Sequence, residues 1–163
     1  MKYTLPHIPD SLLAIQPPET QKVLRKRGAT KPPVEHRVFL DLTDREYPKV
    51  MILGLKLRSL ANWSGKVRDK ITYPARVRNA INAALEGVTL PAPPLTVVLV
   101  RHGPKRLDPT ENAPMSFKHA IDAIAKLLGV DDSRDDLVRY EVRQEKGAYA
   151  VEIRFVRRAE SGE

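Results

Sequence analysis

Seven carboxylate residues gather in the segment 105–136, which reads KRLDPTENAPMSFKHAIDAIAKLLGVDDSRDD. The chain as a whole carries a formal net charge of +8, so this is an acidic segment in an otherwise basic protein. Two explanations are open: the acids are solvated caps and turns, or they hold a hard cation over a substrate that the basic remainder attracts. The residues are Asp108, Glu111, Asp122, Asp131, Asp132, Asp135 and Asp136.

Carboxylate oxygens are the ligands that Mg²⁺ prefers, typically one or two of them with water and phosphate. Such an ion can generate hydroxide and stabilise the leaving oxygen of a phosphodiester. Lys118 stands in the first turn of a predicted helix, where a cation opposes the helix dipole, and it could neutralise charge on a phosphate. Asp122 follows one turn later and is interpreted mainly as a support that holds Lys118, with a weak exposed pair as the alternative.

The other acids have simpler explanations. A solvated turn is preferred for Asp135 and Asp136. A calcium loop in VDDSRDD is disfavoured, because the segment lacks the glycine and the terminal glutamate of the EF-hand pattern.

The composition is that of one soluble domain. A length of 163 residues with 42% apolar residues suffices for a real hydrophobic core. The absence of cysteine excludes disulfides and thiolate metal sites, and the four histidines are too scattered to form a ligand-spaced pair. No apolar run reaches about 18 residues, and the first residues lack the apolar centre of a signal peptide, so we expect a cytoplasmic protein without a membrane span.

Positive charge is concentrated before residue 107. Residues 1–106 contain 19 Lys and Arg against 8 Asp and Glu, whereas residues 107–163 contain 9 against 12. This asymmetry indicates a polyanionic partner. A merely basic, soluble surface is the alternative, because many basic proteins have no nucleic-acid role.

The first 35 residues are the least regular part of the chain. IQPPET and TKPPVE interrupt any helix, so residues 1–35 are predicted to be an N-terminal extension or arm, in which residues 22–31 could contact DNA. A partly disordered tail is the alternative. Residues 36–158 are predicted to form the domain, and residues 159–163 a flexible C-terminus.

Strands and helices follow in the order β-β-α-β-α-β-β. RVFLDL and residues 49–57 predict the first two strands, and LTVVLVR predicts a central strand because its apolar character is nearly continuous. LVRYEVRQ and AYAVEIRF, around EKGA, predict an antiparallel hairpin that closes the chain. The order predicts an α+β fold, a small mixed sheet with two helical segments packed on one face.

The two helical segments differ in regularity. Residues 64–86 contain Pro74, which predicts a kink or a second helix starting there. The second segment ends at about Leu128, and Gly129 stands where a C-terminal cap belongs. The apolar stripe predicted for the first segment consists of Val67, Ile71, Val77, Ile81 and Leu85.

Residues from about 51 to 155 resemble the RusA-like Holliday junction resolvases, especially their phage and prophage members. The matching pieces are RLDPTEN, Lys118, IDAIAKLLGVDDS and the closing YEVRQEKGAYAVEIRF, with LRSLANW and a basic helix upstream. The ordered set is more specific than any single piece. The resemblance implies a homodimer that cleaves four-way DNA junctions with Mg²⁺, or with Mn²⁺ in its place.

The resemblance also implies the roles of individual residues. It makes Asp108, Glu111 and Asp132 catalytic carboxylates that bind the metal, and it makes Lys118 catalytic beside them. Supporting positions are Asn112, Asp122 and Asp131. The chain departs from the family in two ways: Glu111 replaces the usual aspartate before the asparagine, and Pro109 and Thr110 stand where one residue usually separates the acids. A diverged, slow or inactive member is therefore also open.

Three functions remain to be weighed. The leading one is a metal-dependent, structure-selective DNA endonuclease acting in recombination and repair. The second is a catalytically inactive DNA-binding or phage accessory protein that keeps the fold, and the third is an RNA-binding or assembly protein whose acids are caps. For the DNA-binding functions, the expected phosphate contacts are Lys66, Arg68, Lys70, Arg76, Arg78, Arg101, Lys105 and Arg106.

Overall fold

The computed structural model describes residues 36–61 and 63–158. The predicted arm with its basic segment 22–31 and the predicted tail at 159–163 lie outside these residues. The described residues belong to one compact unit that begins at His36.

Five strands and three helices make up the described part of the chain. The predicted order of elements is confirmed, and a short helix, α4, is added before the second long one. The bounds are β1 Val38–Asp41, β2 Lys49–Leu53, α3 Val67–Leu85, β3 Leu95–Gly103, α4 Asn112–Ser116, α5 Lys118–Leu128, β4 Val138–Lys146 and β5 Ala150–Arg157.

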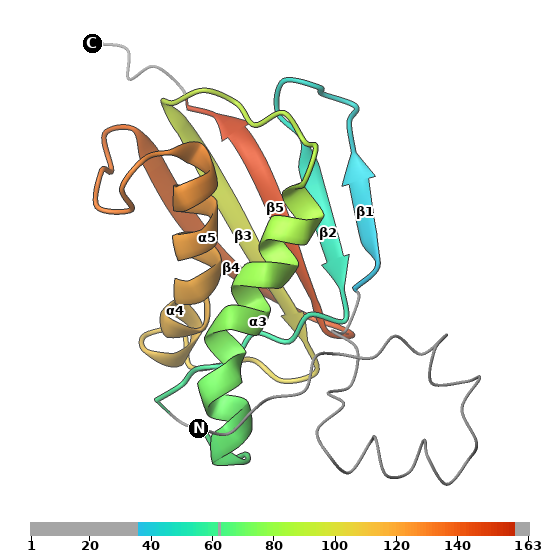
Figure 1. The fold of residues 1–163 in the computed structure, drawn as a ribbon, viewed down its shortest axis with the longest axis vertical. Helices are drawn as coiled ribbons and strands as arrows, with labels where there is room; N and C mark the ends of the chain where they lie inside the picture. Colours follow the sequence, from blue (N-terminus) through green and yellow to red (C-terminus); the bar gives the residue numbers. More distant parts are fainter. Residues whose placement is uncertain (1–35, 62, 159–163) are drawn as a thin grey trace, which may run out of the picture. The chain divides into compact units, whose positions relative to one another are not determined.

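The strands form one mixed sheet in the order β1-β2-β5-β3-β4. Strand β3 pairs with β4 in parallel and with β5 in antiparallel orientation. The predicted hairpin between the last two strands is therefore wrong, because β3 lies between them (Figure 1). The link from β4 to β5 passes the end of β3, where the Gly147 N–H donates to the carbonyl oxygen of Gly103 at 3.1 Å.

Burial explains why β5 takes the inner position. Val151, Ile153 and Phe155 are at most 2% exposed, and Ala150 on the other face is 5% exposed. Strand β4 instead has charged side chains on one face and can remain at the edge, where one side of the backbone meets solvent. A period-two pattern locates both strands but does not say which neighbour each of them pairs with.

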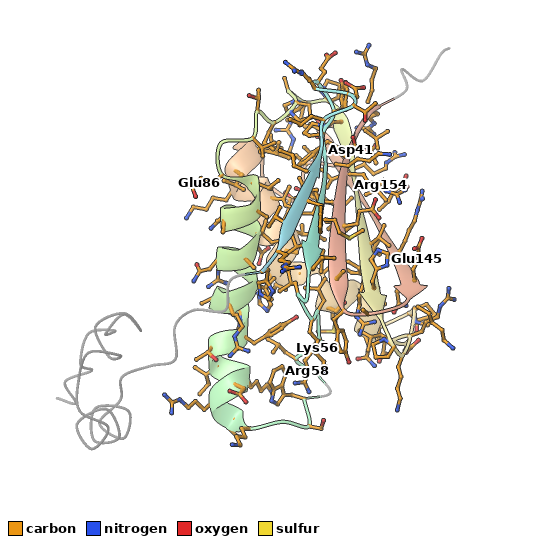
Figure 2. The ribbon with its side chains drawn as sticks, turned by 90° about the vertical axis from the view of Figure 1, so that its right-hand side faces the viewer. Asp41, Lys56, Arg58, Glu86, Glu145 and Arg154 are labelled. Carbon is orange, nitrogen blue, oxygen red and sulfur yellow. The ribbon has the colours of Figure 1, made fainter. Side chains whose placement is uncertain are left out.

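Helices α3 and α5 pack side by side on one face of the sheet, and no described element covers the other face (Figure 2). The predicted two-layer α+β arrangement is confirmed. The core lies between the layers, where each buried aliphatic side chain contributes about 1.5–3 kcal/mol. Fully buried members include Val50, Ile52, Val77, Ile81, Val97, Leu99, Phe117, Ile124 and Ile153.

Helix α3 is a single helix with Pro74 inside it, so no second helix begins there. Its first turns run past the end of the sheet (Figure 1). Val67 and Ile71 are consequently 72% and 74% exposed, which corrects their assignment to the apolar stripe, and Tyr73 is buried in their place. None of the helices in residues 36–61 and 63–158 is both long and apolar enough to cross a membrane.

Candidate functional site

The loop between β3 and α4 holds the first predicted acids. Asp108 Oδ1 accepts hydrogen bonds from the Thr110 backbone N–H at 3.0 Å and from Thr110 Oγ1 at 2.9 Å. These two bonds stabilise the carboxylate and lower the pKa of Asp108. Glu111 is exposed and precedes the first residue of α4, Asn112. Asp108 is thus an exposed residue that closes a tight turn, and Glu111 follows it at the start of a helix.

Lys118 is exposed at the first position of α5. No described ion pair joins it to Asp122, although the two are one turn apart. The interpretation that Asp122 supports Lys118 therefore stays a prediction. Lysine before aspartate is the weaker order for such a pair.

The C-terminal end of α5 turns the chain back along the helix. Gly129 adopts the left-handed conformation with φ of 69°, and its N–H caps the helix as predicted. Asp131 then closes a turn by accepting hydrogen bonds from the Ser133 backbone N–H at 2.9 Å and from Ser133 Oγ at 2.8 Å. These bonds lower the pKa of Asp131. Its side chain is therefore occupied by this turn, and a side-chain hydrogen bond with the adjacent Asp132 also lowers its pKa.

Tyr140 brings two of the acids into one neighbourhood. It lies two residues after Val138 on β4, on the helix-facing side of the sheet, where it packs against the core. Its hydroxyl oxygen is buried and has no hydrogen-bond partner among the described residues. Burial, together with the negative charges of Asp132 and Asp122, raises the pKa of Tyr140 to about 12. The charge of one aspartate on α5 and that of another in the turn after it therefore act on the same phenol.

The three acids predicted to bind one ion are not gathered in a single chain. Within residues 36–61 and 63–158, no three histidine, aspartate or glutamate side chains converge in a way that could hold a metal ion. Asp122 and Asp132 have in common that both act electrostatically on Tyr140. From the sequence, Asp122 was predicted to be a supporting residue, and Tyr140 was not predicted to belong to the site. The one sequence feature that points to Tyr140 is the alternation along β4, which puts it on the same face as Val138.

Residue His119 was also absent from the predicted site. Its ring meets that of Tyr73 edge-on, with 6.0 Å between centroids, and its Nδ1 is buried without a hydrogen-bond partner among the described residues. Burial is the main cause that lowers the pKa of His119; nearby Asp122 opposes this effect, and Arg78 and Lys118 add to it. The start of α5 therefore combines an exposed lysine with a neutral imidazole.

The basic residues of α3 are placed as a phosphate-binding surface requires. Lys66, Arg68, Lys70, Arg76 and Arg78 are all exposed. Asp69 is the acidic residue in the first turn of α3. The first turns of α3, which follow Lys66 and contain Arg68 and Lys70, extend beyond the end of the sheet (Figure 1).

Arg101 is the exception among the predicted phosphate contacts. It is 4% exposed, its Nε donates to the carbonyl oxygen of Leu57 at 3.1 Å, and its Nη1 donates to the carbonyl oxygen of Lys105 at 3.0 Å. Its assignment to DNA binding is therefore wrong, because a buried guanidinium that is already hydrogen-bonded cannot reach a phosphate. Lys105 and Arg106 themselves are exposed.

Comparison with known proteins adds no family: no family model matches the chain, and no curated protein matches its sequence.

Proposed function

We propose that this protein is a Mg²⁺-dependent, structure-selective DNA endonuclease that acts on four-way junctions as a homodimer. The resemblance to the RusA-like resolvases is one support. The second is the path of the chain, in which β3, the acidic loop, α5, the aspartate pair and β4 follow one another as that resemblance implies.

The observation that carries the proposal is that the negative charges of Asp122 and Asp132 both act on Tyr140. The buried hydroxyl of Tyr140 lacks a hydrogen-bond partner among the described residues. This donor set fits a hydrated hard cation, because Mg²⁺ needs only one or two carboxylates and keeps several waters, one of which could accept the Tyr140 hydrogen bond. Asp122 and Asp132 would hold the ion, and Tyr140 would orient its hydration.

The remaining roles fall to residues around the start of α5 and on α3. When bound, the ion would supply a hydroxide nucleophile and charge stabilisation for the leaving oxygen. Lys118 lies one turn from Asp122 and would neutralise charge on the scissile phosphate. The exposed basic residues of α3 would bind the DNA backbone, and they would do so whether or not the ion is present.

A catalytically inactive DNA-binding protein is the second candidate, and a specific observation favours it. Asp108 is engaged with Thr110, and no group of three acids forms a metal site within the described residues. A chain that kept the fold and the basic surface but lost the acidic loop would have these features. It would bind junctions and cleave none of them.

One experiment separates the two candidates. The full chain is incubated with a labelled synthetic four-way junction and with a linear duplex of the same sequence, each with and without Mg²⁺. We expect cleavage of the junction only, and only with the ion. Junction binding without any cleavage would support the inactive protein instead.

Three variants locate the site within the same experiment. Asp122→Asn and Asp132→Asn should each lower the cleavage rate by about 100-fold, while both variants still bind the junction. Asp135→Asn is the matched control, because it makes the same change in charge at an exposed position of the same loop. Full activity of both site variants would move the site elsewhere, and Glu111→Gln would then test the loop before α4.

A further inference from the structure

The face of the sheet opposite the helices carries a hollow of about 460 Å³. Its floor is formed by Thr96 and Val98 of β3, whose side chains are short. The register sets Arg139 of β4 opposite Thr96 and Arg154 of β5 opposite Val98, so long side chains flank the floor on both sides. Paired residues point to the same face of a sheet. The short side chains on β3 between long side chains on β4 and β5 therefore make the hollow.

Five arginines line the hollow, with a single acid, Glu141, among them. The arginines are Arg139, Arg143, Arg154, Arg157 and Arg158. Three of them have a carboxylate partner: Arg143 pairs with Glu141 at 3.4 Å, Arg154 with Glu152 at 3.0 Å and Arg157 with Glu46 at 3.3 Å. The Arg143 and Arg157 pairs are largely exposed, so their carboxylates offset the positive charge only in part, whereas Glu152 is mostly buried and pairs closely with Arg154.

The other two arginines have no carboxylate partner within ion-pair distance among the described residues. Arg139 is exposed and makes no described hydrogen bond. Arg158 Nη1 donates to the carbonyl oxygens of Asp135 at 2.7 Å and of Asp136 at 2.8 Å. Those bonds position the guanidinium without neutralising it. The hollow therefore has a surplus of positive charge and two arginines with free donors, which favours an anionic ligand.

The chemistry of the lining selects phosphate and excludes base recognition. An arginine fork matches two phosphate oxygens, and it keeps its charge at any physiological pH. Among the described residues no aromatic side chain lines the hollow, so they offer no platform on which a base could stack. Arg139 and Arg143 are four residues apart on one face of β4, about 13 Å along the strand, so they can contact different phosphates of one backbone.

We propose that this arginine hollow is a second DNA-contacting surface, which binds the phosphates of a DNA backbone without reading its sequence. It rests on the proposed function only in taking DNA as the polyanion, and it needs neither cleavage nor a metal ion. Figure 2 places Arg154 on the side of the sheet away from α3. The basic side chains of α3 and the hollow therefore face different directions, and one subunit can contact two DNA segments, such as two arms of a junction.

The test measures junction and duplex binding by the full chain in EDTA, across a series of salt concentrations. The variant is Arg139→Gln with Arg143→Gln. Its matched control is Arg37→Gln with Arg45→Gln, which removes the same charge from two exposed residues outside the hollow. Thermal unfolding of all three proteins shows whether the fold is kept.

The hollow variant should lower the slope of log Kd against log salt by about 1.8, because each contacted phosphate contributes about 0.9. The control should keep a slope close to that of the unmodified protein. An unchanged slope in the hollow variant, or an equal loss in the control, would overturn the proposal. Because EDTA prevents metal-dependent cleavage, the binding result stands whether or not the protein is a nuclease.

Pyrophosphate distinguishes a DNA backbone from a small phosphate ligand. It is added to the unmodified protein and to the hollow variant, and both the melting temperature and the binding of the junction are measured. If DNA fills the hollow, millimolar pyrophosphate should weaken junction binding by the unmodified protein more than junction binding by the variant. A melting shift that the variant loses, without any change in its DNA salt slope, would mean that the hollow binds a small phosphate only.

Discussion

The guanidinium group of Arg101 lies against Gly103 so closely that a Cβ atom added at Gly103 would stand 3.1 Å from Arg101 Nη1. The same guanidinium donates to the carbonyl oxygens of Leu57 and Lys105. Strand β3 is thereby tied to the segment before α3 and to the loop that leads to the acidic residues. A shift of the Arg101 guanidinium away from Gly103 would strain these two hydrogen bonds.

Replacing Gly103 by alanine should therefore destabilise the protein. The added methyl group would crowd a side chain held by two hydrogen bonds, and we expect the free energy of unfolding to fall by about 1–3 kcal/mol. Chemical denaturation measures the change. Gly147→Ala is the control, because nothing lies within 4 Å of an added Cβ there and its φ is not positive. Equal stability of the two variants would show that Arg101 gives way.

Replacing Arg101 by glutamine tests the correction of its role. Glutamine removes the positive charge and cannot donate to both carbonyl oxygens as the planar guanidinium does. We expect the free energy of unfolding to fall by about 1.5–3 kcal/mol, the range for a hydrogen bond to a charged group, while the salt dependence of DNA binding stays the same. A salt slope that changes by about 0.9 with unaltered stability would return Arg101 to the DNA-binding surface.

The lowered pKa of His119 predicts a loss of stability in mild acid. Above pH 6.5 the His119 imidazole is neutral in the folded and the unfolded chain, so its burial does not lower the free energy of unfolding. As the pH falls below 6.5 the unfolded chain takes up the proton first, so stability is lost until the pH passes the lower, folded pKa. Denaturation at pH 7.5 and pH 5.5 should show a larger loss for the unmodified protein than for His119→Gln. Equal losses would contradict the prediction.

The strands and long helices could be predicted because local patterns determine them. Gly129 ends α5 where a left-handed residue was expected, and the nearly continuous apolar run of β3 placed it inside the sheet. The pairing of β4 and β5 could not be predicted in this way. It depends on which strand loses more apolar surface to water, and that comparison involves the whole sheet.

The candidate site was only partly predictable for a related reason. The sequence indicated the segment of acids but not which of them face each other. Asp108 and Asp131 are each followed two residues later by a hydroxyl residue, and both close turns with it. Asp122 and Asp132 both act on Tyr140 because the chain turns back at Gly129 and β4 places Tyr140 against the core, a tertiary arrangement that spacing alone does not specify.

The shared effect of Asp122 and Asp132 on Tyr140 leads to a prediction that needs no cleavage assay. The proposed site predicts that a divalent ion binds at these two carboxylates. Mn²⁺ is a suitable probe, because as a paramagnetic ion it broadens the NMR signals of nearby nuclei. Added at substoichiometric amounts, it should broaden the signals of Asp122, Asp132 and Tyr140 before those of Asp135 and Asp136.

Substitutions then separate a specific site from general attraction to acids. Asp132→Asn should weaken Mn²⁺ binding by about 10-fold or more, since it removes one of two carboxylate ligands. Asp135→Asn removes the same charge three residues later in the same loop, so an ion that merely collects near negative charge would respond to both changes alike. Tyr140→Phe should leave the affinity within a few-fold, because the hydroxyl would contact bound water and not the ion. Broadening centred on Asp135 and Asp136 would contradict the site and favour the inactive DNA-binding protein.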